Sequence, residues 1–129
     1  MAGRRDHHHA AAGFLVAAVV LLGAHAVAGA GDGWQTGRAS AYSSVDSPGR
    51  MACTGTRVPG DRLLVAHKSL PCGSRLRVCN AGVCVTVRVA DRGPYIPGRV
   101  LDLTPGVIKA FGVPSPRVWG VRTVSWKRL

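Results

Sequence analysis

The sequence predicts a mainly β protein, a small closed barrel of six short strands with one short helix. Three observations support this fold class. The chain of 129 residues is long enough for one domain at most. Short runs of alternating apolar and polar residues recur along it, and 17 glycines and 8 prolines mark turns between them. The charged content of 18% and the 47% of hydrophobic residues exclude a disordered chain.

The period-2 runs and turn residues give the expected element boundaries. A glycine-rich segment at 31–37 precedes the first strand. Strands are expected at 38–43, 62–67, 74–79, 83–90, 98–103 and 118–125. One helix is expected at 105–111, with Thr104 as its N-cap, Pro105 in its first turn and Gly112 at its end. Three apolar residues of this helix should face the core: Val107, Ile108 and Phe111.

Residues 75–89 (RLRVCNAGVCVTVRV) carry the clearest strand–turn–strand signal. If Cys79 faces Cys84, every apolar side chain lies on one face of the hairpin and both sulfurs lie on the other. A slip of one residue would destroy this agreement. The same register sets Arg75 opposite Arg88, an unfavourable pair of like charges.

All four cysteines follow residue 30. An even number in a small exported chain indicates disulfides. Zinc is the alternative, but the chain has no C-x-x-C pair and only His67 among its histidines follows residue 30. We therefore expect Cys79–Cys84 across the hairpin and Cys53–Cys72, the latter worth about 3 kcal/mol. We expect no metal and no cofactor.

The N-terminus resembles a secretory signal peptide. Arg4 and Arg5 precede an apolar run at 10–24, and small residues in A-x-A patterns follow. We expect a signal peptide at 1–30, a linker at 31–37 and the barrel domain at 38–127. An uncleaved membrane anchor is the alternative, although the run is shorter than the about 20 residues of a span. No cysteine follows the run directly, so we expect a secreted or cell-wall-associated protein that is not a lipoprotein.

The charge is strongly basic, with 17 Lys and Arg against 6 acidic residues, all of them aspartate. Removing residues 1–30 takes away two arginines and one aspartate and leaves a net charge of +10. Such a domain, expected to be a monomer, should be drawn to anionic cell-wall polymers. Nucleic acid is the rival partner, but we expect no specific binding to it and only a salt-sensitive, nonspecific interaction.

Three segments carry chemistry: Val65–Gly73 (VAHKSLPCG), Val89–Tyr95 (VADRGPY) and Gly98–Thr104 (GRVLDLT). With these segments the chain resembles the rare lipoprotein A (RlpA)-like family over about residues 38–125. The family's fold is the six-stranded double-psi β-barrel, which expansins and barwin-like proteins share more distantly. One departure is Thr56, which stands where many family members carry a glutamate.

The resemblance implies an exported lytic transglycosylase that cleaves peptidoglycan glycan strands and leaves 1,6-anhydromuramic ends. It implies Asp91 as the acid and base and His67 as its positioning partner. To serve as an acid near neutral pH, Asp91 needs an environment that favours its neutral form, and Asp102 is the expected neighbour. Arg92 should point away from that carboxyl, toward substrate or solvent.

Other interpretations of these residues stay open. Tyr42, Tyr95 and Trp119 are candidate sugar-binding aromatics, although exposed aromatics are as often packing residues. Asp91 could be a turn residue, His67 a hydrogen-bonded core residue, and Asp102 a structural residue or a second acid. The alternative function is that of a non-catalytic, expansin-like module that binds and loosens wall polysaccharide.

Overall fold

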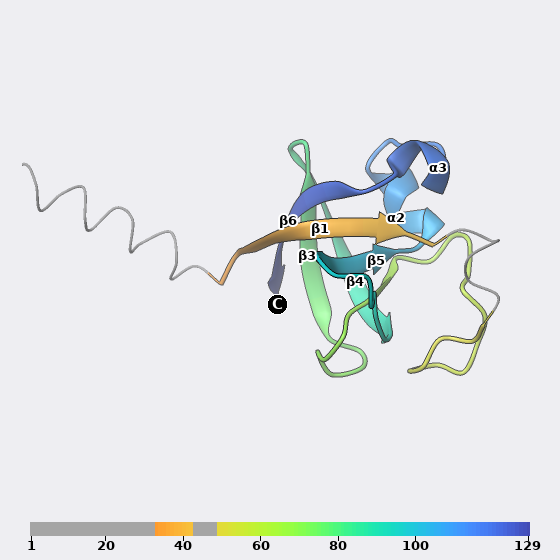
Figure 1. The fold of residues 1–129 in the computed structure, drawn as a ribbon. Helices are drawn as coiled ribbons and strands as arrows, with labels where there is room; N and C mark the ends of the chain where they lie inside the picture. Colours follow the sequence, from red (N-terminus) through yellow and green to blue (C-terminus); the bar gives the residue numbers. More distant parts are fainter. Residues whose placement is uncertain (1–32, 43–48) are drawn as a thin grey trace, which may run out of the picture. The chain divides into compact units, whose positions relative to one another are not determined.

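The computed structural model describes residues 33–42 and 49–129, and the expected signal peptide at 1–30 lies outside them. Figure 1 labels the strands and helices of the barrel, with the exception of β2. They are β1 (Gln35–Ala41), β2 (Leu64–Ala66), β3 (Arg75–Asn80), β4 (Val83–Asp91), β5 (Arg99–Leu103), α2 (Pro105–Ala110), α3 (Pro116–Trp119) and β6 (Arg122–Arg128).

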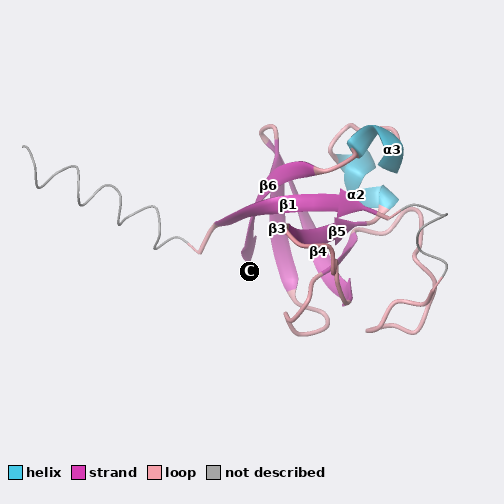
Figure 2. Ribbon diagram, viewed as in Figure 1, coloured by secondary structure: helices cyan, strands magenta, loops and turns pink. Residues whose placement is uncertain are grey.

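The strands close into one barrel in the order β1-β5-β2-β4-β3-β6, which confirms the six-stranded β-barrel. Figure 2 shows α2 and α3 lying together near the C-terminal end of β1. The barrel interior is filled mainly by valine and leucine side chains, together with Ala39 from β1, Trp126 from β6 and Trp119 from α3. Among the described residues, no helix is long and apolar enough to cross a membrane.

The hairpin register is confirmed. Cys79 pairs with Cys84, and Arg75 pairs with Arg88. From Arg75 to Val89 the apolar residues of both strands point inward and the polar ones outward, except Val83, which is 44% exposed beside the turn. Ala90 instead packs in a second apolar cluster with Met51 and Leu64. Both expected disulfides are present, Cys79–Cys84 and Cys53–Cys72. The period-2 pattern determines the register because only one face of this hairpin is buried.

The first strand begins at Gln35, inside the segment expected to be a linker. Gly37 lies in this strand, where no other residue type would fit, because a Cβ at this position would meet Cγ2 of Val100 at 2.3 Å. The glycine at this position thus allows close packing of β1 on β5 rather than a flexible connection.

The expected strand at 118–125 is wrong in its first half. Residues 116–119 form α3, and β6 begins only at Arg122. Ser115 caps this helix by accepting a hydrogen bond from the Val118 amide at 3.3 Å, and Pro116 occupies its first turn. The helix turns the chain so that Trp119 enters the core and its indole Nε1 donates to the Ala39 carbonyl at 2.9 Å. Trp119 is therefore a packing residue, and its expected role in sugar binding is wrong.

The expected helix is confirmed as α2, but Thr104 does not cap it through its side chain. Its hydroxyl instead donates to the Arg62 carbonyl at 2.6 Å and accepts from the Leu64 amide at 3.3 Å. Thr104 is fully buried, so these bonds tie the start of the helix to the segment that leads into β2.

Candidate active site

Four residues lie side by side across the outer face of the barrel. Asp91 on β4 pairs with Ala66 on β2, Ala66 pairs with Asp102 on β5, and Asp102 pairs with Ser40 on β1. Their chain neighbours on β1, β2 and β5 point into the core, so this row faces outward. Because adjacent strands are about 4.8 Å apart, the backbones of the two aspartates lie about 10 Å from each other.

A β-bulge in β4 turns Asp91 toward this face. Val65 pairs with Val89, whereas the next residue, Ala66, pairs with Asp91, so Ala90 is the extra residue. Strict alternation would have sent Asp91 into the barrel with Val89. Bulges recur beside active sites because they redirect a side chain in this way.

Three residues of the row, Ser40, Asp91 and Asp102, line a cleft of about 550 Å³. The cleft contains five of the seven residues expected to act on substrate: Tyr42, Asp91, Arg92, Tyr95 and Asp102. His67 and Trp119 do not line it. Arg50 and Val58, from the segment before β2, also line the cleft. So do Ile96, just before β5, and Arg99, its first residue. Tyr95 is 76% exposed at the edge of the cleft.

Three donors hold the Asp91 carboxylate. The Tyr42 hydroxyl donates to Oδ2 at 2.6 Å, and the backbone amides of Ala52 and Arg92 both donate to Oδ1 at 2.8 Å. Hydrogen bonds to an ionised group are among the stronger ones in proteins. Both carboxylate oxygens are therefore fixed in orientation at the cleft.

Tyr42 lies at the C-terminal end of β1 and is buried. Burial raises the pKa of its hydroxyl far above the ordinary value, and the hydrogen bond to Asp91 and the negative charges of Asp91 and Asp102 raise it further. The hydroxyl therefore stays protonated at neutral pH and acts only as a donor toward the carboxylate.

His67 is linked to Asp91 through the backbone, since its amide donates to the Asp91 carbonyl at 3.1 Å. The imidazole points elsewhere. Its Nδ1 accepts from the amides of Ser69 and Leu70 at 3.1 and 3.0 Å, and its ring packs edge-on against Trp126 at 5.5 Å. Burial lowers the pKa of the ring, and the nearby cations Arg92 and Lys68 lower it further. A neutral ring with its proton on Nε2 fits these contacts.

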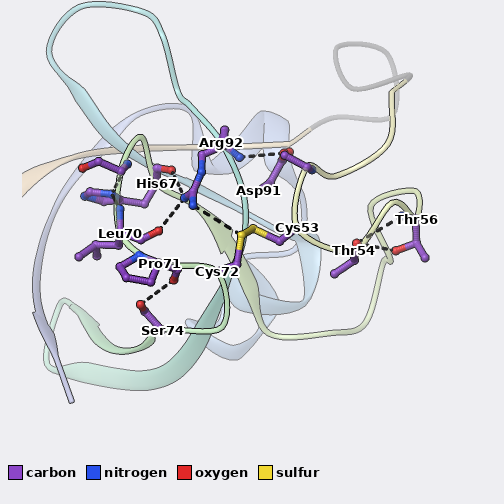
Figure 3. The surroundings of a disulfide bond; sticks show 12 residues. Cys53, Thr54, Thr56, His67, Leu70, Pro71, Cys72, Ser74, Asp91 and Arg92 are labelled. Atoms are coloured by element: carbon purple, nitrogen blue, oxygen red, sulfur yellow. Dashed lines mark hydrogen bonds between the residues drawn. A yellow bond between two sulfur atoms is a disulfide. The ribbon is translucent and has the colours of Figure 1, made fainter.

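Arg92 points away from the Asp91 carboxyl, as expected, but toward the 67–72 loop rather than toward substrate or solvent. Its guanidinium donates to the carbonyls of Leu70 and His67 at 2.7 and 3.2 Å and to the sulfur of Cys72 at 3.5 Å (Figure 3). The planar guanidinium of Arg92 can therefore donate to several acceptors of the loop at once. Arg92 thus joins the chain beside Asp91 to the loop that contains His67.

The segment 50–57 contributes to the site in a way that the side-chain pattern did not indicate. Its Ala52 amide bonds Asp91, and the next amide, that of Cys53, donates to the Ala90 carbonyl at 3.0 Å. The Cys53–Cys72 disulfide fastens the same segment to the loop that Arg92 holds (Figure 3). A backbone donor has no signature in the sequence, so only the structure reveals it.

Thr56, at the position of the family's glutamate, does not line the cleft. Its hydroxyl lies 2.9 Å from that of Thr54, and its amide donates to the same Thr54 oxygen at 3.3 Å. These contacts between the two threonines therefore stabilise the turn within segment 50–57. Within the described part of the chain, no group of three or more His, Cys, Asp or Glu residues is placed to hold a metal.

Comparison with curated proteins gives relatives with one recurring name. The chain is 43% identical over 89 residues to the "Probable endolytic peptidoglycan transglycosylase RlpA" of Nostoc sp., a match that covers 67% of this chain and 24% of that protein. It is 44% identical over 72 residues to the "Endolytic peptidoglycan transglycosylase RlpA" of Yersinia pestis, covering 54% and 20%. The match spans about a quarter of the length of these relatives.

Solved structures give the same fold. The Streptomyces papain inhibitor has a TM-score of 0.56 at 25% identity and covers 74% of this chain and 94% of its own. An expansin of Clavibacter michiganensis has a TM-score of 0.55 at 28% identity and covers 74% and 50%. These neighbours place the barrel in the double-psi group. The family described as lytic transglycolase matches residues 35–125, and the chain therefore belongs to that family, as the three RlpA-like segments predicted.

Proposed function

We propose that this protein is a lytic transglycosylase that cleaves the glycan strands of peptidoglycan and leaves 1,6-anhydromuramic ends. The observation that carries the proposal is the Asp91 carboxylate, fixed by three donors at an open cleft that also contains Asp102. The names of the curated relatives support the same reaction.

In the proposed reaction, Asp91 acts in its protonated form, with the proton on Oδ2, because Oδ1 already accepts from two backbone amides. It delivers this proton to the glycosidic oxygen as the bond to the anomeric carbon breaks. The 6-hydroxyl of the same muramic acid attacks that carbon, and Asp91 then takes up the hydroxyl proton. The carboxyl thus ends the cycle as it began, and no water is consumed. Asp102, two strands away, stabilises the positive charge that develops on the sugar ring.

Substrate binding follows from the remaining residues of the cleft. The exposed ring of Tyr95 and the half-exposed Ile96 offer an apolar surface to a sugar face. Arg50 and Arg99 line the same cleft and supply positive charge toward the lactyl carboxylates of muramic acid, which are free where the stem peptides have been removed. These cations favour an acidic glycan over a neutral one.

His67 and Arg92 act in this proposal as positioning residues. Together they fix the 67–72 loop, and the backbone amide of each donates to Asp91, that of His67 to the carbonyl and that of Arg92 to the carboxylate. We also propose that the barrel acts outside the cell, on the wall, as a monomer, after removal of residues 1–30. The positive charge of the chain suits that anionic surface.

A second candidate function is a non-catalytic module of the expansin kind. It is supported by the likeness to the Clavibacter expansins, one of which was solved in complex with cellohexaose. The threonine at position 56 is consistent with it, since one potential acid is missing.

The products of digestion separate these functions. Purified protein is incubated with sacculi, either intact or stripped of stem peptides, and the soluble products are analysed by mass spectrometry. The proposal predicts glycans with 1,6-anhydro ends from at least one substrate. Products with reducing ends only would indicate a two-carboxylate hydrolase. Binding to sacculi with no product from either substrate would favour the expansin-like module.

A further inference from the structure

Four cations form a compact group on the outer face of β3, β4 and β6, which we call the cationic face. It consists of Arg75, Arg77, Arg88 and Lys127. Arg75 pairs with Arg88 across β3 and β4, and Arg77 pairs with Lys127 across β3 and β6. With strands about 4.8 Å apart and alternate residues about 7 Å apart, the four side chains start within about 12 Å of one another.

The arrangement is unfavourable for the folded protein by itself. Like charges directly opposite each other in a sheet are destabilising, and this face contains two such pairs. The described part of the chain contains only three carboxylate side chains. Asp91 and Asp102 line the cleft, and the backbone of Asp61 packs against Gly106 of α2.

Two of the three described carboxylate side chains thus belong to the cleft, and the cationic face remains available to an external anionic ligand.

An exposed aromatic residue extends the cationic face. The ammonium of Lys127 lies 5.1 Å from the centre of the Trp34 ring, and Trp34 is 37% exposed. The contact orients the ammonium by a cation–π interaction and leaves an apolar strip beside it. A ligand with alternating anionic and aliphatic parts would match both features.

The cationic face is separate from the cleft. None of its four residues lines the cleft, which lies over the other side of the barrel on β1, β5 and the end of β4. A polymer bound to the cationic face would leave Asp91 accessible to a glycan strand.

We propose that the cationic face binds a linear phosphodiester polymer of the polyol-phosphate type, such as a poly(glycerol phosphate) chain of a bacterial wall. Guanidinium groups pair with phosphate through two parallel hydrogen bonds, and three of the four cations are arginines. A glycerol phosphate repeat has six backbone bonds and extends about 7 Å, since two extended peptide residues of the same bond count span that length. This length matches the spacing of the cations along β3.

A polyol phosphate fits this face better than a single-stranded nucleic acid. Proteins that bind single strands stack successive bases on several aromatic side chains. Among the described residues, Trp34 is the only exposed aromatic ring beside the cationic face, at its edge rather than along it. The function of the site would be to hold the barrel on the wall while the cleft acts on glycan, a role that rests on the proposed function.

The test compares two double variants that each remove two positive charges. Arg77→Gln with Lys127→Gln alters the cationic face, and Lys109→Gln with Arg117→Gln alters exposed cations on α2 and α3. Binding of the full chain to a fluorescent poly(glycerol phosphate) oligomer is measured over a range of salt concentrations. Four phosphate contacts predict that log Kd rises with log salt at a slope of about 3, and the first variant should lower that slope by about 1.4.

We expect the cationic-face variant to bind at least tenfold more weakly than wild type at about 0.15 M salt, and the control variant to bind within twofold of it. Equal losses in both variants would overturn the proposal in favour of nonspecific attraction to net charge. Tighter binding of duplex DNA than of the oligomer would assign the face to nucleic acid instead.

Two further measurements distinguish a loss of binding from a loss of folding and from a loss of enzyme activity. The melting temperature of the cationic-face variant should equal or exceed that of wild type, because a like-charge pair is removed. If it falls, Arg88→Gln alone repeats the comparison, with Arg117→Gln as its control. Cleavage of sacculi stripped of phosphodiester polymer should be the same in wild type and variant, so failure of the binding proposal and failure of the proposed enzyme activity are distinguishable.

Discussion

Breaking the Cys53–Cys72 disulfide should lower both stability and activity, whereas breaking Cys79–Cys84 should lower stability alone. The first bond joins residues 19 positions apart and the second joins residues 5 apart. In the chain-entropy treatment these loops correspond to about 3 and about 2 kcal/mol of stability. For a domain of this size, about 3 kcal/mol corresponds to a fall in melting temperature of roughly 15 °C.

The effect on activity follows from the position of the first bond. Cys53 is next to Ala52, whose amide is one of the three donors to Asp91. A free segment would leave one oxygen of the carboxylate with a single donor, the amide of Arg92. Loss of one charge-assisted hydrogen bond is worth about 1.5 kcal/mol or more, which corresponds to at least a tenfold loss of turnover. Cys79–Cys84 lies on the hairpin, and neither of its cysteines lines the cleft.

The assay uses paired serine substitutions, Cys53→Ser with Cys72→Ser and Cys79→Ser with Cys84→Ser. Thermal unfolding followed by circular dichroism gives the stability. Release of anhydro-ended glycan is measured well below both melting temperatures, so that unfolding does not contribute. Equal activity in the two variants, or a larger loss of stability from the shorter loop, would refute the reasoning.

Three other substitutions test separate parts of the structure. Burial lowers the pKa of His67, so the unfolded chain binds a proton more readily than the folded one, and stability should fall as the pH drops below about 6.5. His67→Asn should flatten this pH dependence in denaturation measured from about pH 7 to 5. Gly106→Ala should lower the free energy of unfolding by about 2 kcal/mol, because its Cβ would meet the Asp61 carbonyl at 2.7 Å; an unchanged urea midpoint would contradict this. Tyr42→Phe removes a donor to Asp91 and should lower turnover about ten- to a hundredfold with little change in melting temperature; wild-type turnover would show that the bond is not used.

The parts of the fold that the sequence predicted well are those in which local pattern and burial agree. The hairpin is such a case, because Cys79, Cys84 and the alternating valines admit one register. The region before β6 is the opposite case. The Ser115–Pro116 cap is a real local signal, but it starts a helix of only four residues, and the apolar residues that follow suit a strand equally well.

The site could be predicted only as far as side chains define it. Asp91, Asp102 and Tyr42 do lie together in one cleft. The bulge at Ala90, which aims Asp91 outward, and the backbone donor of Ala52 depend on pairing between distant segments. For the same reason, the sequence pointed to Arg92 and His67 without showing that both hold a loop.

The central claim is that the Asp91 carboxyl transfers the proton in glycan cleavage. Asp91→Asn retains the size of the side chain, and its amide oxygen can still accept from the Ala52 and Arg92 amides while its NH2 group donates to the Tyr42 oxygen, but it cannot act as the acid. Asp102→Asn is the matched control on the same outer face, two strands away.

The most direct measurement is therefore the rate at which wild type, Asp91→Asn and Asp102→Asn release 1,6-anhydro-ended glycans, together with their binding to sacculi. We predict that Asp91→Asn binds sacculi as wild type does and releases product at least about a thousandfold more slowly, and that Asp102→Asn loses less. Release of anhydro-ended glycan by Asp91→Asn at the wild-type rate would contradict the assignment of this carboxyl as the acid and base.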